Sequence, residues 1–354
     1  MSTINHRRAV ACLAALCLST SAAAAPPGVD AQGTATIAGF QAPYSAYASP
    51  QARGMFQRVL DEGRHAPPLT GPIAASRTYY DRINTDRADT MKRLYPVKIE
   101  SKTIGGVSTQ VVTPRQGIAP GQRQRVLINL HGGAFLWGAG SGGLVESIPI
   151  ASLGRIEVVT VDYRQGPEHT FPAASEDVAA VYRVLLKRYP ARNIGIYGCS
   201  AGGFLTAESV AWFIPKKLPV PGAIGTFCGS ITELDGDSAY VAPVLNGEPA
   251  PKTLLKLADL PYFKGAKATD PLMFPANSPA LLAQFPPTLL ITGTRDFTMS
   301  SVIQSQRLLT MAGVDAELHV WDGMWHSFFS DPAMPESREA YKVIVSFFDR
   351  KLGR

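Results

Sequence analysis

Residues 193–203 read NIGIYGCSAGG, an apolar run that leads into Ser200, with Gly198 and Gly202 two positions away on either side. The run predicts a buried strand, and residues 204–214 after it have the apolar pattern of a helix. A sharp turn from strand to helix needs small residues beside its central residue and lifts that side chain clear of the backbone. The pattern is short enough to occur by chance, so the rest of the chain must decide whether this serine is a nucleophile.

Five other segments have the same form, an apolar run that ends in a polar or glycine-rich group. Runs rich in Val, Ile and Leu, separated by helical patterns such as residues 174–190, indicate a mostly parallel, doubly wound α/β sheet with helices on both faces. The functional groups of such a sheet lie at the carboxyl ends of its strands. The five segments are RVLINLHGG (125–133), IEVVTVDYR (156–164), GAIGTFCGS (222–230), PPTLLITGTRD (286–296) and AELHVWDGMWH (316–326).

Two segments interrupt this alternation. Residues 26–95 contain helix-like stretches ahead of a predicted hairpin at 96–114, and residues 232–275 are rich in Pro, Gly and Asp between two core strands. Loops of that length are commonly lids or binding elements. We therefore expect an α/β catalytic domain over 96–354 and a helical cap built from 26–95 and from about 232–275.

The first 25 residues have the form of a secretory signal peptide. Arg7 and Arg8 precede a short apolar run, and small residues up to Ala25 predict cleavage before Pro26. The run is too short to span a bilayer, so we expect no stable membrane anchor and an exported protein, either periplasmic or secreted.

Composition argues against several classes of function. The 354 residues include 34 basic and 28 acidic ones, and loss of Arg7 and Arg8 with the leader would leave 32 basic residues. These are scattered and lack an aromatic platform, so no nucleic-acid partner is expected. There is no H-E-x-x-H helix and no Cys/His cluster at metal-ligand spacing, so no metal and no cofactor are expected. The oligomeric state is not indicated.

A serine nucleophile needs a base, and the base must be oriented by a third group. Only His319 and His326 follow Ser200. Alternation in AELHVW makes His319 an ordinary strand residue, whereas His326 lies just after the strand, on a loop from which a base can reach a nucleophile. We therefore predict that His326 is the base.

The predicted acid is Asp296, which ends TLLITGTRD at the carboxyl end of the preceding strand. The resulting chain order, Ser, Asp, His, is that of the α/β-hydrolase triad. Asp270 and Asp322 compete for the role, but Asp270 lies in the predicted cap and Asp322 lies in the same turn as His326.

The segment LHGGAF (130–135) supplies the remaining part of a hydrolase site. Consecutive glycines after a core strand let backbone N–H groups point at a developing oxyanion. We predict that the amides of Gly132, Gly133 and Ala201 form this oxyanion hole, against the alternative of a flexible turn at a strand end.

Taken together, these motifs resemble the bacterial hormone-sensitive-lipase family of α/β-hydrolases, also called family IV esterases. The resemblance covers the chain from about residue 97 to its end and implies a serine carboxylesterase with a helical cap, acting mostly on short or medium acyl esters. The motifs that carry it, in order, are HGGAF (131–135), VDYRQGPEHTFPAASED (161–177), GCSAGG (198–203), GTRD (293–296) and GMWHSF (323–328).

The resemblance assigns the same nucleophile, acid, base and oxyanion positions as the reading above, and it adds a set of scaffold positions. Three residues depart from the family's usual pattern: Cys199 stands in place of aspartate, Ala134 in place of a third glycine, and Phe297 in place of proline. Alanine still offers a backbone amide, so the departures bear on substrate preference. The scaffold positions are His131, Asp162, Tyr163, Arg164, Glu168 and His169.

Aromatic residues near the motifs suggest an apolar pocket for a small ester substrate. Phe135, Trp137 and Trp325 are candidates to line it, although each could equally be a core residue under the cap. An amidase, a lactonase or a peptidase with the same triad is an alternative. A non-catalytic small-molecule receptor on this fold is a further one, against which all three triad positions are filled.

Two cysteines, Cys199 and Cys228, remain after removal of the leader. They fall at the ends of successive core strands, and neighbouring strands lie ~4.8 Å apart, within the Cα range that a disulfide accepts. Buried free cysteine is common as a small apolar filler. Two buried thiols are therefore the favoured interpretation, with a disulfide left open.

Overall fold

The computed structural model describes residues 28–353 except 37–38, 40 and 69–70, so the predicted signal peptide lies outside the described residues. The chain divides into two units, one ending at Pro43 and the other spanning Tyr44–Arg354. In the first unit, β1 (Gly28–Val29) pairs antiparallel with β2 (Ala35–Thr36). The helix-like stretches expected within residues 26–95 follow this pair of strands, and the first helix begins at Pro50.

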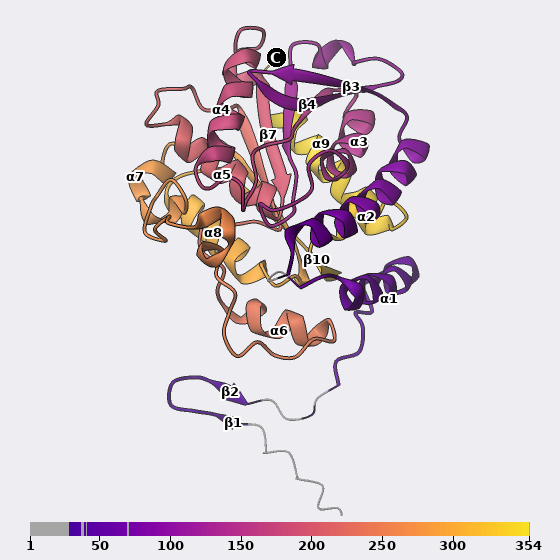
Figure 1. The fold of residues 1–354 in the computed structure, drawn as a ribbon, viewed down its shortest axis with the longest axis vertical. Coiled ribbons are helices and arrows are strands. Elements are labelled where there is room, and N and C mark those ends of the chain that lie inside the picture. The colour runs from indigo at the N-terminus through magenta and orange to yellow at the C-terminus, as the bar shows by residue number, and fades with distance from the viewer. Residues whose placement is uncertain (1–27, 37–38, 40, 69–70, 354) are drawn as a thin grey trace, which may run out of the picture. The chain divides into compact units, whose positions relative to one another are not determined.

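The second unit is built on an eight-stranded sheet in the order β10-β9-β8-β7-β5-β6-β4-β3. Strands β3, β4, β7 and β10 of this sheet are labelled in Figure 1. The strands from β5 to β10 run parallel, and only the β3–β4 hairpin and the β4–β6 pair are antiparallel, as predicted for a mostly parallel sheet. The strands are β3 (Val97–Ile104), β4 (Val107–Pro114), β5 (Val126–Leu130), β6 (Glu157–Val161), β7 (Ile194–Cys199), β8 (Ala223–Phe227), β9 (Thr288–Arg295) and β10 (Ala316–Trp325).

Helices cover both faces of this sheet, which explains why β5, β7 and β8 are buried on every residue rather than on alternate ones. The buried residues of α4, α5 and α8 join one hydrophobic cluster, and those of α3 and α9 join another on the opposite face. The α-helices are α1 (Pro50–His65), α2 (Ile73–Leu94), α3 (Ser141–Gly154), α4 (Ala173–Leu185), α5 (Ala201–Phe213), α6 (Asp237–Leu245), α7 (Pro279–Leu282), α8 (Met299–Met311) and α9 (Pro335–Lys351).

Short 3-10 turns complete the structure at Pro120–Gln122, Ala191–Asn193, Leu257–Asp259, Pro261–Phe263, Pro275–Asn277 and Phe328–Ser330. None of the helices in the described part of the chain combines the length and the apolar character needed to cross a bilayer.

Helix α1 begins where its sequence provides a cap. Ser49 Oγ accepts the amide of Ala52 at 3.0 Å, and Pro50 occupies the first helical position, where no N–H is needed. The carboxylate of Glu336 accepts the amide and the hydroxyl of Ser49, which ties this cap to the start of α9. The buried side chains of α1, with Ala88 and Met91 of α2, join the cluster formed by α3 and α9.

Candidate active site

Ser200 lies at the turn between β7 and α5, with φ +56° and ψ −125°. A non-glycine residue is rarely held in such a conformation, and the surrounding packing enforces it. A Cβ on Gly198 would lie 2.1 Å from the carbonyl oxygen of Leu130, and a Cβ on Gly202 only 1.7 Å from that same oxygen. Both glycines of the motif are therefore required by the close approach of the turn to β5.

A continuous chain of hydrogen bonds joins the three predicted catalytic residues. His326 Nε2 lies 2.8 Å from Ser200 Oγ, and His326 Nδ1 lies 2.8 Å from Asp296 Oδ1. An ionised carboxylate can only accept, so Nδ1 carries the proton and Nε2 accepts from the serine hydroxyl. The Asp296 side chain is fully buried, while 23% of the His326 side chain is exposed. This is the arrangement in which a histidine can take a proton from a serine.

The Asp296 carboxylate is held by further donors. Oδ1 accepts the amide of Thr298 and Oδ2 accepts the hydroxyl of Thr292, each at 2.9 Å. Burial by itself would raise the pKa of Asp296, but the charge and the hydrogen bond of His326, with the two other donors, leave it below its usual value. The carboxylate is therefore ionised at neutral pH and can orient the imidazole.

The competing residues lie elsewhere. Asp322 Oδ1 accepts the hydroxyl of Thr294 at 3.0 Å, and Asp270 Oδ1 accepts the amide of Leu272 at 2.8 Å. His319 is within β10, as alternation predicted.

One predicted oxyanion donor is already engaged. The Gly132 amide donates to Glu146 Oε1 at 2.9 Å, so it is not free for a substrate, and that prediction needs correction. The amides of Gly133, Ala134 and Ala201 have no acceptor among the described residues. All three residues line the cavity that contains Ser200.

Glu146, on α3, is a residue that the sequence analysis missed. Its carboxylate accepts the amide of Gly132, the side-chain amide of Asn129 at 3.0 Å and the amide of Cys199 at 3.2 Å. Burial raises the pKa of Glu146 to about 7, against the three donors, which lower it. One side chain thus holds the glycine loop and the residue before Ser200 in a fixed relation.

Several of the predicted scaffold positions hold loops. The Tyr163 hydroxyl donates to the carbonyl of His131 at 2.7 Å, and Asp162 accepts the amide of Gly140 at 2.7 Å. Arg77 of α2 donates to both oxygens of Glu168 at 2.7 Å and to the carbonyl oxygens of the two loops that carry Leu136 and Gly166.

A cavity of about 560 Å³ opens over Ser200 and is lined mostly by apolar groups. Trp137 and Trp325 are in its wall, and Trp137 stacks on Tyr80 with ring centroids 4.5 Å apart. Phe135 is not in the wall: it is fully buried and stacks on Tyr262 in the core, so its prediction as a pocket residue is wrong. Its left-handed backbone, with φ +58°, accompanies this inward placement.

Phe297 shapes the cavity beside the predicted base. Its ring centroid lies 4.5 Å from that of His326, and 37% of the residue is exposed. The departure from proline at this position therefore places an aromatic ring directly against the imidazole.

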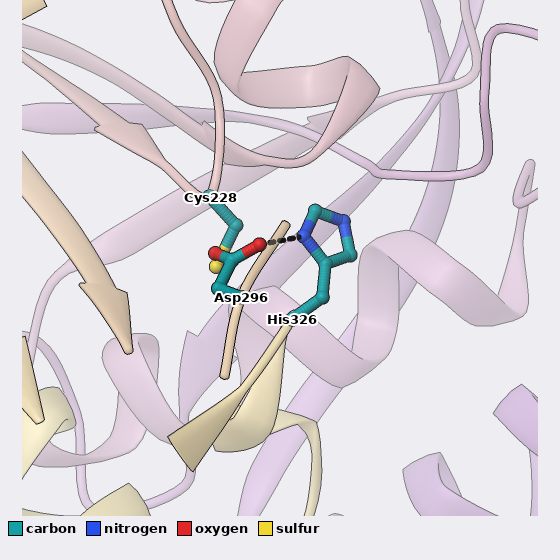
Figure 2. A group of neighbouring side chains, drawn as sticks. All are labelled: Cys228, Asp296 and His326. Atoms are coloured by element: carbon teal, nitrogen blue, oxygen red, sulfur yellow. Dashed lines mark hydrogen bonds and ion pairs between the residues drawn. The ribbon is translucent and has the colours of Figure 1, made fainter. Parts of the chain in front are cut away.

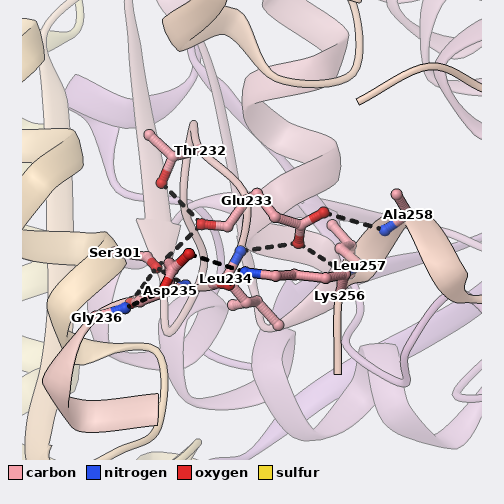
Figure 3. Close-up of polar contacts among 9 residues, drawn as sticks. All are labelled: Thr232, Glu233, Leu234, Asp235, Gly236, Lys256, Leu257, Ala258 and Ser301. Atoms are coloured by element: carbon pink, nitrogen blue, oxygen red, sulfur yellow. Dashed lines mark hydrogen bonds and ion pairs between the residues drawn. The ribbon is translucent and has the colours of Figure 1, made fainter. Parts of the chain in front are cut away.

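Glu233 and Asp235 contact residues 256–258, and we call this set of contacts the loop clasp (Figure 3). The clasp holds the part of the cavity wall that Leu234 and Leu257 form. Glu233 Oε1 accepts the amides of Leu234 at 2.8 Å and Leu257 at 2.7 Å, and Lys256 pairs with Asp235 at 2.9 Å. Because Leu234 and Leu257 line the cavity, the clasp fixes part of its wall.

Cys199 and Cys228 are both free, buried thiols, the arrangement that the sequence favoured. Their strands are neighbours, with Cys199 opposite Phe227. Both contact Ser327, the residue after His326: its amide lies 3.3 Å from Cys228 Sγ, and its hydroxyl lies 2.9 Å from Cys199 Sγ.

Comparison with known proteins agrees with this fold. A family profile described as alpha/beta hydrolase fold matches residues 127–330. An acetyl-hydrolase of Streptomyces hygroscopicus is 28% identical over 290 residues, which are 80% of this chain and 92% of that protein. The crystal structure of esterase E25 superposes with a TM-score of 0.78 at 30% identity, covering 90% of this chain and 99% of that one. An esterase of the bacterial hormone-sensitive lipase family superposes with a TM-score of 0.75 at 26% identity, covering 86% of this chain and 99% of that one.

Proposed function

Because this chain belongs to the bacterial hormone-sensitive-lipase family of α/β-hydrolases, we propose that this carboxylic ester hydrolase is a serine esterase that works through an acyl-enzyme on Ser200. His326 acts as the base and Asp296 orients it. The observation that carries the proposal is the hydrogen-bonded chain from Ser200 through His326 to Asp296, with both bonds at 2.8 Å.

The reaction follows from the placement of the protons. As Ser200 Oγ attacks the ester carbonyl carbon, His326 Nε2 accepts its proton, and the buried carboxylate of Asp296 stabilises the imidazolium. The amides of Gly133, Ala134 and Ala201 donate to the oxyanion that develops. His326 then protonates the departing alkoxide, and a water molecule activated by the same imidazole hydrolyses the acyl-enzyme.

The cavity supports a small ester with an apolar acyl or alcohol group. Its volume of about 560 Å³ is within the range of sites for small organic ligands, and aromatic and aliphatic side chains form most of its wall. Residues of α1, α2 and the 232–275 segment line it, among them Val59, Tyr80 and Leu257, and we assign these segments as its cap. Short- to medium-chain carboxylic esters are the substrates that we propose.

The test is hydrolysis of p-nitrophenyl esters of increasing chain length, beside a matched amide and a lactone. Ser200→Ala, His326→Ala and Asp296→Asn should each lower kcat by orders of magnitude, and double variants should lose little more, because triad residues act as a unit. His319→Ala is the matched control and should retain activity. A Ser200→Ala protein with a tenth of the wild-type activity would refute the assignment.

We further propose export of the protein, supported by the basic and apolar composition of residues 1–25. Sequencing of the amino terminus of protein recovered outside the cytoplasm should begin at Pro26. Recovery of a full-length chain only from the cytoplasm would contradict this.

A further inference from the structure

Three side chains of different chemistry lie close together at the predicted active site, and the predicted base is one of them. Cys228 directly follows β8, Asp296 directly follows β9 and His326 directly follows β10, and these strands are neighbours in the sheet. The Cys228 sulfur, a carboxylate oxygen of Asp296 and a ring nitrogen of His326 all lie within 4.8 Å of one another (Figure 2). The group is therefore placed by three adjacent strand ends, which are rigid parts of the fold.

The donor set is one that zinc accepts. Zn²⁺ binds thiolate sulfur at ~2.3 Å, imidazole nitrogen at ~2.0 Å and carboxylate oxygen at ~2.0 to 2.2 Å, and a sulfur ligand disfavours the hard cations Mg²⁺ and Ca²⁺. A tetrahedral cation at these bond lengths needs nitrogen and oxygen ligands ~3.4 Å apart. His326 Nδ1 and Asp296 Oδ1 are now 2.8 Å apart, so these two atoms would have to separate by roughly 0.6 Å to share a cation.

A cation at this group would share Asp296 with the donors from Thr292 and Thr298. Cys228 and Asp296 are fully buried, and the Cys228 sulfur also contacts the Cys199 thiol and, at 3.3 Å, the Ser327 amide. His326 and Ser327 line the cavity, so a cation that enters it reaches the near side of the group. Removal from water strengthens the attraction between a cation and a buried carboxylate.

We propose that Cys228, Asp296 and His326 form a binding site for a borderline divalent cation of the Zn²⁺ class, and that its occupancy switches the esterase off. The switch rests on the proposed function, since it acts through His326, whereas the binding itself does not.

The switch follows from the position of one proton. In the active arrangement, Nδ1 of neutral His326 carries the ring proton and Nε2 accepts from Ser200. A cation bound at Nδ1 forces that proton to Nε2, so the ring can donate to Ser200 but can no longer accept its proton. The Cys228 S–H bond breaks as the S–metal bond forms, and its proton leaves to solvent. Binding of each cation therefore releases a single proton and removes the base.

Cys199 provides a matched control. It is a buried thiol in the same region, and its sulfur lies 2.9 Å from the hydroxyl of Ser327, but it is not one of the three donors. Cys199→Ser and Cys228→Ser remove chemically equal thiols, and serine at 228 still offers an acceptor to the Ser327 amide. Cys228→Ala is the second variant if the serine form does not fold.

The experiment measures binding and activity separately on the full chain. CdCl₂ is titrated while the thiolate-to-cadmium ultraviolet absorption and the released protons are recorded, and ZnCl₂ is titrated during hydrolysis of a p-nitrophenyl ester. Each variant is compared with its own activity in chelator. Wild type and Cys199→Ser should show the thiolate-to-cadmium absorption, the release of a proton on cadmium binding, and inhibition of ester hydrolysis by zinc. Cys228→Ser should lose the absorption and need at least ~10- to 100-fold more zinc for half inhibition, the range found when even a supporting partner of a metal ligand is lost.

Three results would overturn the proposal: no cadmium absorption in the wild type, an unchanged zinc response in Cys228→Ser, or loss of the response in Cys199→Ser with its retention in Cys228→Ser. A wild-type protein that binds cadmium but hydrolyses no ester would instead refute the proposed function and leave the binding site standing.

Discussion

Glu146→Gln should change the stability of the protein by an amount that depends on pH. The pKa of Glu146 is raised by burial from an ordinary 4.5 to about 7 in the folded protein. Below pH 4.5 both the folded and unfolded states hold the proton, so the group contributes nothing. Between 4.5 and about 7 the unfolded state ionises first, so stability falls as pH rises. Above about 7 both states are ionised and the loss is complete.

The size of the loss follows from the two pKa values. A pKa difference of this size lowers the free energy of unfolding by about 3 kcal/mol at alkaline pH. About 0.8 kcal/mol of this is already lost near pH 5. Glutamine does not titrate. It also carries N–H donors, and one of them must face Gly132 or Cys199, which costs about 1 to 3 kcal/mol at every pH. The variant should therefore be less stable than the wild type near pH 5 and should recover by about 2 to 3 kcal/mol, relative to the wild type, near pH 8.5.

Urea unfolding followed by tryptophan fluorescence measures this directly, provided that the m-values agree. Glu100→Gln, at an exposed position of β3, removes the same charge from the surface and should show no such recovery. An equal stability difference between Glu146→Gln and the wild type at both pH values would refute the reasoning. Because Glu146 joins the glycine loop to the turn of Ser200, the variant should also lose kcat, by up to ~100-fold if the loop moves by about 1 Å.

Three further predictions concern the turn, the loop clasp and metals. Gly202→Ala should destabilise the protein by at least the ~1 to 3 kcal/mol of an overpacked core, since its Cβ would lie 1.7 Å from a backbone oxygen that cannot move away, and thermal unfolding should show it. Glu233→Ala should raise KM for the longer esters more than it lowers kcat, because it frees the amides that hold Leu257 in the cavity wall, and equal kinetics across the chain-length panel would contradict that role. EDTA should not lower activity, because the proposed nucleophile, base and acid are all side chains; inhibition by EDTA that zinc reverses would contradict the mechanism.

Much of the fold and the proposed triad could be predicted because the signals are local. Each core strand is a contiguous apolar run, and parallel strands bring their carboxyl ends to one edge, so Ser200, Asp296 and His326 are gathered by topology alone. The hydrogen bonds of the structure join the same three residues.

What the sequence could not supply depends on directions and on contacts between distant elements. Whether the N–H of Gly132 or that of Gly133 faces the cavity is decided by backbone angles, and whether Phe135 points to the core or the cavity is decided in the same way. Glu146 lies in a helix that is apolar on nearly every side, and nothing in its neighbours indicates three amide donors from other elements. Cys228 is nearly 70 residues from Asp296, so no spacing rule could associate the two.

The contact of Gly198 and Gly202 with the carbonyl of Leu130 has a consequence for laboratory evolution of this enzyme. The turn has almost no tolerance for added atoms, so libraries that randomise Gly198 or Gly202 will consist mostly of unfolded chains. Selection for new esters can instead succeed where the wall is made of side chains on separate segments, at positions such as Val59 and Leu255. Substrate specificity and catalysis can therefore be changed by separate substitutions. A variant selected for a bulkier ester should keep the catalytic residues of the wild type in place.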